Sequence, residues 1–104
     1  MSSEIEFEVS ALLRAMQNAM DWQIEEHGED WADDDEKWSS FFDDLSESVA
    51  CGYTGNIGSE NIDQVVKEAI QELDGREDWR LDILKEAQVY QKRWEDEDNS
   101  RGSQ

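Results

Sequence analysis

The longest run of regularly spaced apolar residues lies at the N-terminal end of the chain. The residues recur every three or four positions, as they do on the buried face of an α-helix. They are Ile5, Val9, Leu12, Leu13, Met16, Met20 and Ile24. Ser3 with Glu6 fits the capping box that begins a helix, and Gly28 is a typical helix stop. The pattern therefore predicts a helix over residues 4–27.

The first residues of this segment also allow a different structure. Ile5, Phe7 and Val9 alternate with glutamates, which is the two-residue period of a half-buried strand. A strand needs a partner, and the rest of the chain offers no obvious second strand. We therefore favour the helix and keep the strand as the alternative.

Three more segments repeat the helical pattern. Residues 34–51 form the second, with Asp33 or Asp34 as its N-cap, and Ser59 is expected to cap the third, which ends at Gly75. Asp78 is expected to cap the fourth, whose last apolar residue is Trp94. The residues expected to be largely buried come from all four helices: Leu13, Met16, Phe42, Leu45, Val66, Ile70, Ile83 and Leu84.

Amphipathic helices with short connections predict an all-α fold, a compact bundle of about four helices. The chain has 104 residues and no proline, so nothing divides it into separate domains. We expect residues 1–94 to form a single acidic helical domain. Residues 95–104 contain no apolar residue and are expected to be a disordered tail.

The charge is the second strong feature of the sequence. The net charge is −19, from 28 acidic and nine basic residues, whereas a magnitude of about 2–8 is enough for the solubility of a small domain. Residues 1–66 carry a net of −15 and residues 67–104 a net of −4. Direct binding to nucleic acid or to an anionic membrane needs clustered lysine and arginine, so we expect a basic protein as the partner.

The densest negative charge lies between Glu25 and Glu47. Trp31 lies within it, and Trp22 just before it; both fall outside the apolar stripes. We favour core positions for both and keep exposed interface anchors as the alternative. We expect the following residues to bind the partner: Glu25, Glu26, Glu29, Asp30, Trp31, Asp33, Asp34, Asp35, Glu36, Asp43, Asp44 and Glu47.

Catalytic, metal and cofactor sites are poorly supported by the sequence. His27 and Cys51 are single residues without a placed catalytic partner. The acids at 33–36 are contiguous and lack the glycine of a calcium-binding loop. The glycines at 52, 55 and 58 follow no strand and precede no P-loop lysine, which favours a turn. We expect no enzyme activity, no bound metal and no cofactor.

The start of the chain lacks the basic and apolar regions of a signal peptide, and no run approaches the ~20 apolar residues of a membrane span. These features favour a cytoplasmic protein. The sequence leaves the oligomeric state open, a homodimer included.

Carboxylates on a helix lie about 5–6 Å apart, a spacing similar to that of phosphates on DNA. Our first hypothesis is a nucleic-acid mimic that occupies the basic groove of a DNA- or RNA-binding protein. In size and charge the chain resembles small phage and mobile-element proteins that block restriction or CRISPR enzymes. The alternative is an acidic adaptor that docks on a basic partner without mimicry. Adaptation to high salt is a third explanation, although its charge would cover the whole surface.

Overall fold

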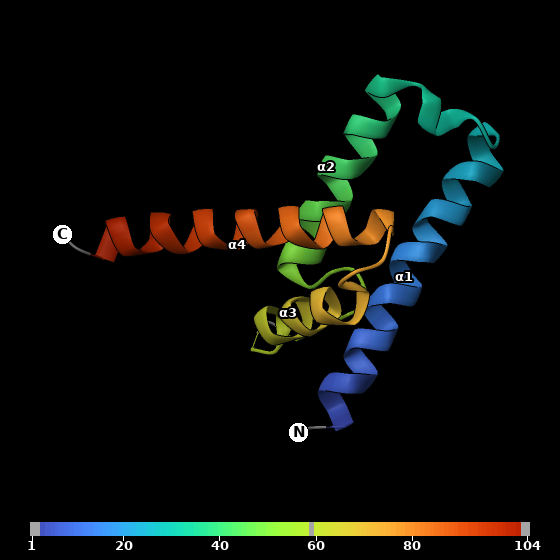
Figure 1. The fold of residues 1–104 in the computed structure, drawn as a ribbon. Helices are drawn as coiled ribbons and strands as arrows, with labels where there is room; N and C mark the ends of the chain where they lie inside the picture. Colours follow the sequence, from blue (N-terminus) through green and yellow to red (C-terminus); the bar gives the residue numbers. More distant parts are fainter. Residues whose placement is uncertain (1–2, 59, 103–104) are drawn as a thin grey trace.

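The computed structural model describes residues 3–58 and 60–102 (Figure 1). These residues form four α-helices and one short 3-10 helix, and no strand occurs among them. The elements are α1 (Ser3–His27), η1 (Trp31–Asp33), α2 (Asp35–Cys51), α3 (Ile62–Leu73) and α4 (Trp79–Gly102). The prediction of an all-α bundle is confirmed, and the strand alternative for the first residues is excluded.

The helices do not lie side by side along one common axis. α1 and α2 are joined through η1 at one end of the molecule, and α4 crosses α2 (Figure 1). The closest packing is between α2 and α4, between α1 and α3, and between α3 and α4. The C-terminal half of α4 projects beyond the other helices. The radius of gyration is accordingly 14.7 Å, against about 13 Å for a compact chain of this length.

The core lies where α3 meets the other helices. Of the residues expected to be buried, Leu13, Phe42 and Ile70 are only partly buried, because they lie at the edges of their apolar stripes. The remaining five are buried: Met16, Leu45, Val66, Ile83 and Leu84.

Most helix ends lie where the sequence places them. Asp34 is the N-cap of α2, and its Oδ1 accepts hydrogen bonds from the backbone N–H groups of Glu36 and Lys37. Gly52 ends α2 in the left-handed conformation, with φ of 83°. The third helix begins later than predicted, at Ile62, after an N-cap asparagine that makes no side-chain capping bond. Ser59, the predicted cap, lies outside the described residues.

The C-terminal end of the fourth helix extends past Trp94. α4 continues to Gly102, and residues 103–104 lie outside the described part. Glu95, Asp96 and Glu97 are exposed, so this part of the helix adds nothing to the core. No proline or glycine interrupts the helix before Gly102.

Candidate partner-binding surface

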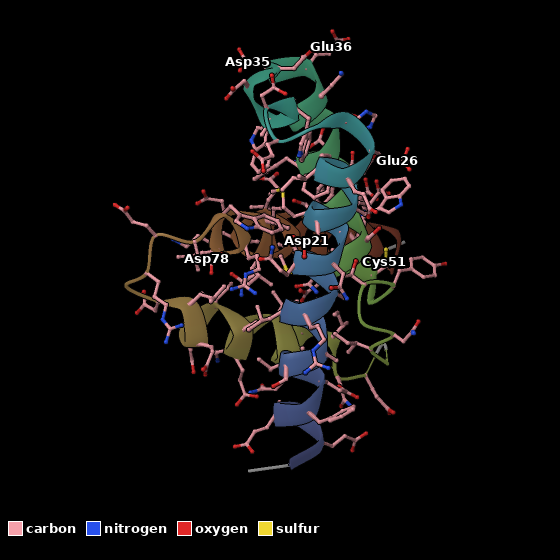
Figure 2. All side chains as sticks on the ribbon, turned by 90° about the vertical axis from the view of Figure 1, so that its right-hand side faces the viewer. Asp21, Glu26, Asp35, Glu36, Cys51 and Asp78 are labelled. Atoms are coloured by element: carbon pink, nitrogen blue, oxygen red, sulfur yellow. The ribbon has the colours of Figure 1, made fainter. Side chains whose placement is uncertain are left out.

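Most of the predicted binding residues lie in the turn that joins α1 to α2. Figure 2 shows Asp35 and Glu36 at this end of the molecule, with Glu26 on the neighbouring end of α1. Every carboxylate in the turn is exposed. We call this set the acidic turn; it consists of Glu25, Glu26, Glu29, Asp30, Asp33, Asp34, Asp35 and Glu36.

Local geometry holds the acidic turn in one shape. Gly28 takes a positive φ of 95°, and its N–H donates to the Ile24 carbonyl at 2.8 Å. The Trp31 N–H then donates to the Gly28 carbonyl at 3.3 Å, and the Asp34 N–H to the Trp31 carbonyl at 3.1 Å. The backbone of the turn is therefore bonded from one helix to the next.

Trp31 anchors the turn from inside. Its side chain is 4% exposed and contacts Phe41 edge to face, with ring centroids 5.1 Å apart, and Trp38 at 6.0 Å. Phe41 in turn contacts Trp79 of α4 at 6.1 Å. Trp31 is thus a core residue, and its prediction as a binding residue is corrected. Its burial fixes the position of the carboxylates around it.

The three remaining acids of α2 do not share one surface with each other. Asp43 and Glu47 follow Glu36 by seven and eleven positions, which places all three on one face of the helix. Asp43 and Glu47 lie near Tyr90 of α4. Partial burial raises the pKa of the Tyr90 hydroxyl, and the negative charges of Asp43 and Glu47 raise it further.

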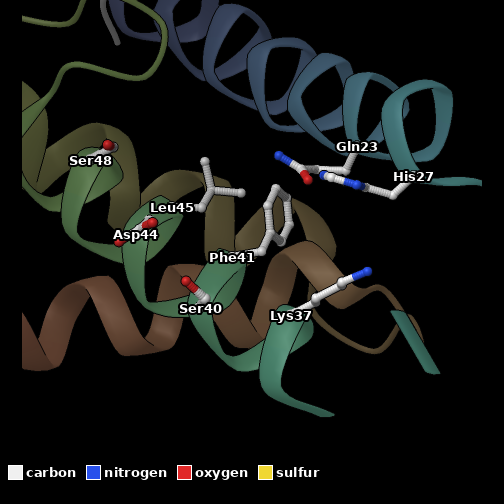
Figure 3. A pocket seen from close by; sticks show the side chains of 8 residues that line it. All are labelled: Gln23, His27, Lys37, Ser40, Phe41, Asp44, Leu45 and Ser48. Carbon is white, nitrogen blue, oxygen red and sulfur yellow. The ribbon is translucent and has the colours of Figure 1, made fainter. Parts of the chain in front are cut away.

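Asp44 points elsewhere, into a cleft of about 370 Å³ between α1 and α2 (Figure 3). Gln23 and His27 of α1 and Lys37 of α2 also line this cleft, above an apolar wall that includes Phe41. The cleft therefore mixes positive and negative groups, in contrast to the uniformly negative acidic turn.

Within the described residues, no carboxylate of the acidic turn makes an ion pair closer than 4.0 Å, although Lys37 directly follows Glu36. The one such pair there joins Arg80 of α4 to Asp78, which caps that helix. The charge of the acidic turn is therefore available to a partner.

The exposure of Trp22 could not be predicted clearly from the sequence. This residue is 57% exposed and follows Asp21, with Glu25 and Glu26 one helical turn further on. It lies off the stripe of Met16 and Met20, which is a sequence signal for exposure, although a core position was favoured. Trp22, and not Trp31, can contact a partner.

The candidate catalytic residue Cys51 has an unreactive setting. Its thiol donates to the Glu47 carbonyl at 2.9 Å. Partial burial, and then the charge of Glu47, raise the pKa of this thiol, which disfavours the thiolate that a nucleophile requires. In the described part of the chain, no three His, Cys, Asp or Glu side chains are placed to hold a metal ion. Nor is any described helix long and apolar enough to cross a membrane.

Comparison of the chain with protein-family models, with curated proteins and with solved structures finds no match. The functional argument therefore depends on the surface itself.

Proposed function

We propose that the protein binds a basic, nucleic-acid-binding protein through its acidic turn and the face of α2 that carries Asp43 and Glu47, and so occupies the groove that would otherwise hold DNA or RNA. An inhibitor of a restriction or CRISPR enzyme is the corresponding functional class. The observation that carries the proposal is the group of exposed, unpaired carboxylates on a turn whose backbone is held by hydrogen bonds and by the buried Trp31.

Electrostatics explains why such a surface would compete with nucleic acid. Phosphates lie about 3.4 Å apart along each strand of DNA, and helical carboxylates about 5–6 Å apart. A groove lined with lysine and arginine would attract either array, and association driven by charge is fast. The carboxylates repel one another, and this repulsion lowers the folding stability of the free protein. Binding to a basic partner would relieve it.

The first experiment identifies the target by capture from a lysate at low and high salt. The second displaces labelled DNA or RNA from the isolated target with the protein. A variant with Glu26, Glu29 and Glu36 changed to Gln and Asp33 to Asn should displace nucleic acid more weakly, by up to about 1000-fold, because four exposed ion pairs contribute about 0–1 kcal/mol each.

A matched control keeps the net charge of that variant but changes a different surface. It carries Asp74→Asn, Asp82→Asn, Glu77→Gln and Glu95→Gln, all at exposed positions. We expect it to displace nucleic acid nearly as well as the natural protein. The mimic proposal fails if saturating protein leaves the nucleic acid bound to the target.

Exposed Trp22 favours the adaptor as a second candidate function. An interface that depends on a tryptophan anchor buries it at its centre. An adaptor would bind its partner without displacing nucleic acid, and Trp22→Ala would weaken it more than the fourfold change in the acidic turn. For a mimic, the fourfold change in the acidic turn would weaken binding more than Trp22→Ala.

A further inference from the structure

A groove lies between α1 and α3, away from the acidic turn. Its volume is about 470 Å³, within the range of pockets that hold ligands. Val9 is buried and Leu13 partly buried, and these two residues give it an apolar floor. Glu6, Glu68 and Glu72 contribute three carboxylates around this floor.

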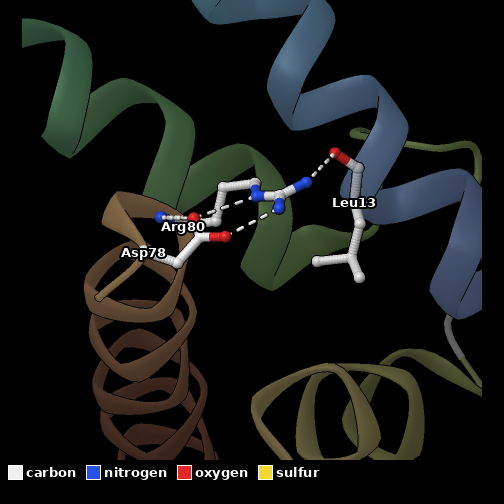
Figure 4. A network of polar contacts seen from close by, with 3 residues as sticks. All are labelled: Leu13, Asp78 and Arg80. Atoms are coloured by element: carbon white, nitrogen blue, oxygen red, sulfur yellow. Dashed lines mark hydrogen bonds and ion pairs between the residues drawn. The ribbon is translucent and has the colours of Figure 1, made fainter. Parts of the chain in front are cut away.

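The floor of the groove is fixed by a hydrogen bond to α4 and by packing in the core. The Leu13 carbonyl accepts a hydrogen bond of 3.2 Å from Arg80 of α4, so α1 is tied to a second helix at this position (Figure 4). Val9 belongs to the buried core. The apolar surface is therefore formed before any ligand arrives.

The three carboxylates have no cation of their own. Neither Glu6, Glu68 nor Glu72 makes an ion pair within the described part of the chain, although Glu68 is partly buried. They also do not form a metal-binding cluster. The groove thus combines separated negative charges with an apolar surface, which suits a long cation better than a small ion.

We propose that this groove receives an arginine side chain from the basic protein partner. The methylene stem of arginine packs on apolar surface while its charged end stays at the rim. The planar guanidinium has five N–H donors and pairs with more than one carboxylate at once. The inference rests on the proposed function for the nature of the partner, but it adds a contact separate from the acidic turn.

The test uses the full-length protein and a short peptide with two arginines separated by glycines. Methyl NMR signals of Val9 and Leu13 report occupation of the groove. The variant Glu68→Gln/Glu72→Gln should bind the peptide about tenfold more weakly, which corresponds to about 1.4 kcal/mol for the two lost ion pairs together. The control Asp74→Asn/Glu77→Gln has the same net charge and should lose less than about twofold.

Three results would overturn the proposal. The first is equal weakening in both double variants, which would show attraction by net charge alone. The second is binding that leaves the Val9 and Leu13 methyl signals unchanged. The third is equal binding of spermidine, which lacks a guanidinium group and would show that the groove accepts any long cation. Circular dichroism and thermal melting confirm that each variant remains folded.

The test is independent of the nucleic-acid competition. If the protein displaces nucleic acid but the peptide does not occupy the groove, only the groove proposal is wrong. If the peptide occupies the groove but nucleic acid is not displaced, the mimic proposal is wrong and the groove remains a contact for a basic partner.

Discussion

The start of α4 offers the sharpest test of how the bundle is held together. The Asp78 Oδ1 accepts from the backbone N–H and from Nε of Arg80, both at 3.0 Å, and Oδ2 accepts from Nη2 at 2.7 Å. Arg80 Nη1 then donates to the Leu13 carbonyl of α1 (Figure 4). The Asp78 and Arg80 side chains are 17% and 21% exposed. One carboxylate therefore caps a helix and orients the group that ties α4 to α1.

Three substitutions separate these contributions. Asp78→Ala removes the cap, which is worth about 1 kcal/mol, and the bonds to a charged group, worth about 1.5–3 kcal/mol. We expect the free energy of unfolding to fall by about 2.5–4 kcal/mol in total. Asp78→Asn keeps a capping side chain and should lose about 1.5–3 kcal/mol. Arg80→Met keeps an apolar stem and the cap of Asp78, and should lose a similar amount.

Urea denaturation followed by circular dichroism measures these losses. In the double variant Asp78→Ala/Arg80→Met, the two losses should sum to more than the observed loss by at least about 1 kcal/mol, because both remove the same ion pair. Additive losses, or a loss below about 1 kcal/mol for Asp78→Ala, would refute the reasoning.

The pH dependence has a defined sign. Hydrogen bonds from Arg80 are the main cause that lowers the pKa of Asp78 below its ordinary value of 3.8. In the intermediate range the unfolded chain binds more protons than the folded one, so this stabilisation is complete above pH 3.8 and is lost as the pH falls through the lowered pKa. The stability difference between the natural protein and Asp78→Asn should therefore shrink in this acid range. A difference that stays constant there would contradict the pairing.

Three further outcomes are expected. Gly52→Ala should lower the free energy of unfolding by about 1–3 kcal/mol, because φ is +83° and the new Cβ would lie 2.5 Å from the Ile57 carbonyl oxygen; Gly58→Ala, where a Cβ meets nothing within 4 Å, is the control. Added sodium chloride should raise the melting temperature by screening the net charge of −19; a steady decrease would argue against self-repulsion. Cys51 should react with a thiol reagent at neutral pH more slowly than free cysteine, since its pKa is raised. An equal rate would contradict the inference that its surroundings disfavour the thiolate.

Periodicity was enough to predict the four helices. The stripes of apolar residues set their phases, and local capping chemistry at Asp34 and Asp78 set two of their beginnings. These are interactions between residues close in sequence, so a single sequence contains them. The third helix was placed too early because a serine suggested a cap, whereas the helix begins at Ile62.

Interactions between distant residues could not be predicted in this way. Trp31 belongs to no stripe, and its ring packs on Trp38 and Phe41, the second of which also contacts Trp79. Only the turn between α1 and α2 and the crossing of α4 bring this cluster together. Asp44 and Asp43 are adjacent in sequence, but one faces α1 and the other lies near α4. The sequence therefore predicted the acidic residues of the site but not their separation into different surfaces.

The limited packing of α1 has a consequence for the order in which parts of the protein open. α2, α3 and α4 all pack on one another, whereas α1 packs mainly on α3 and η1. Backbone amides in the C-terminal half of α1 should therefore exchange hydrogen for deuterium before those at the crossing of α2 and α4. Such an opening of α1 would carry Glu25 and Glu26 away from the rest of the acidic turn while the other three helices stay folded.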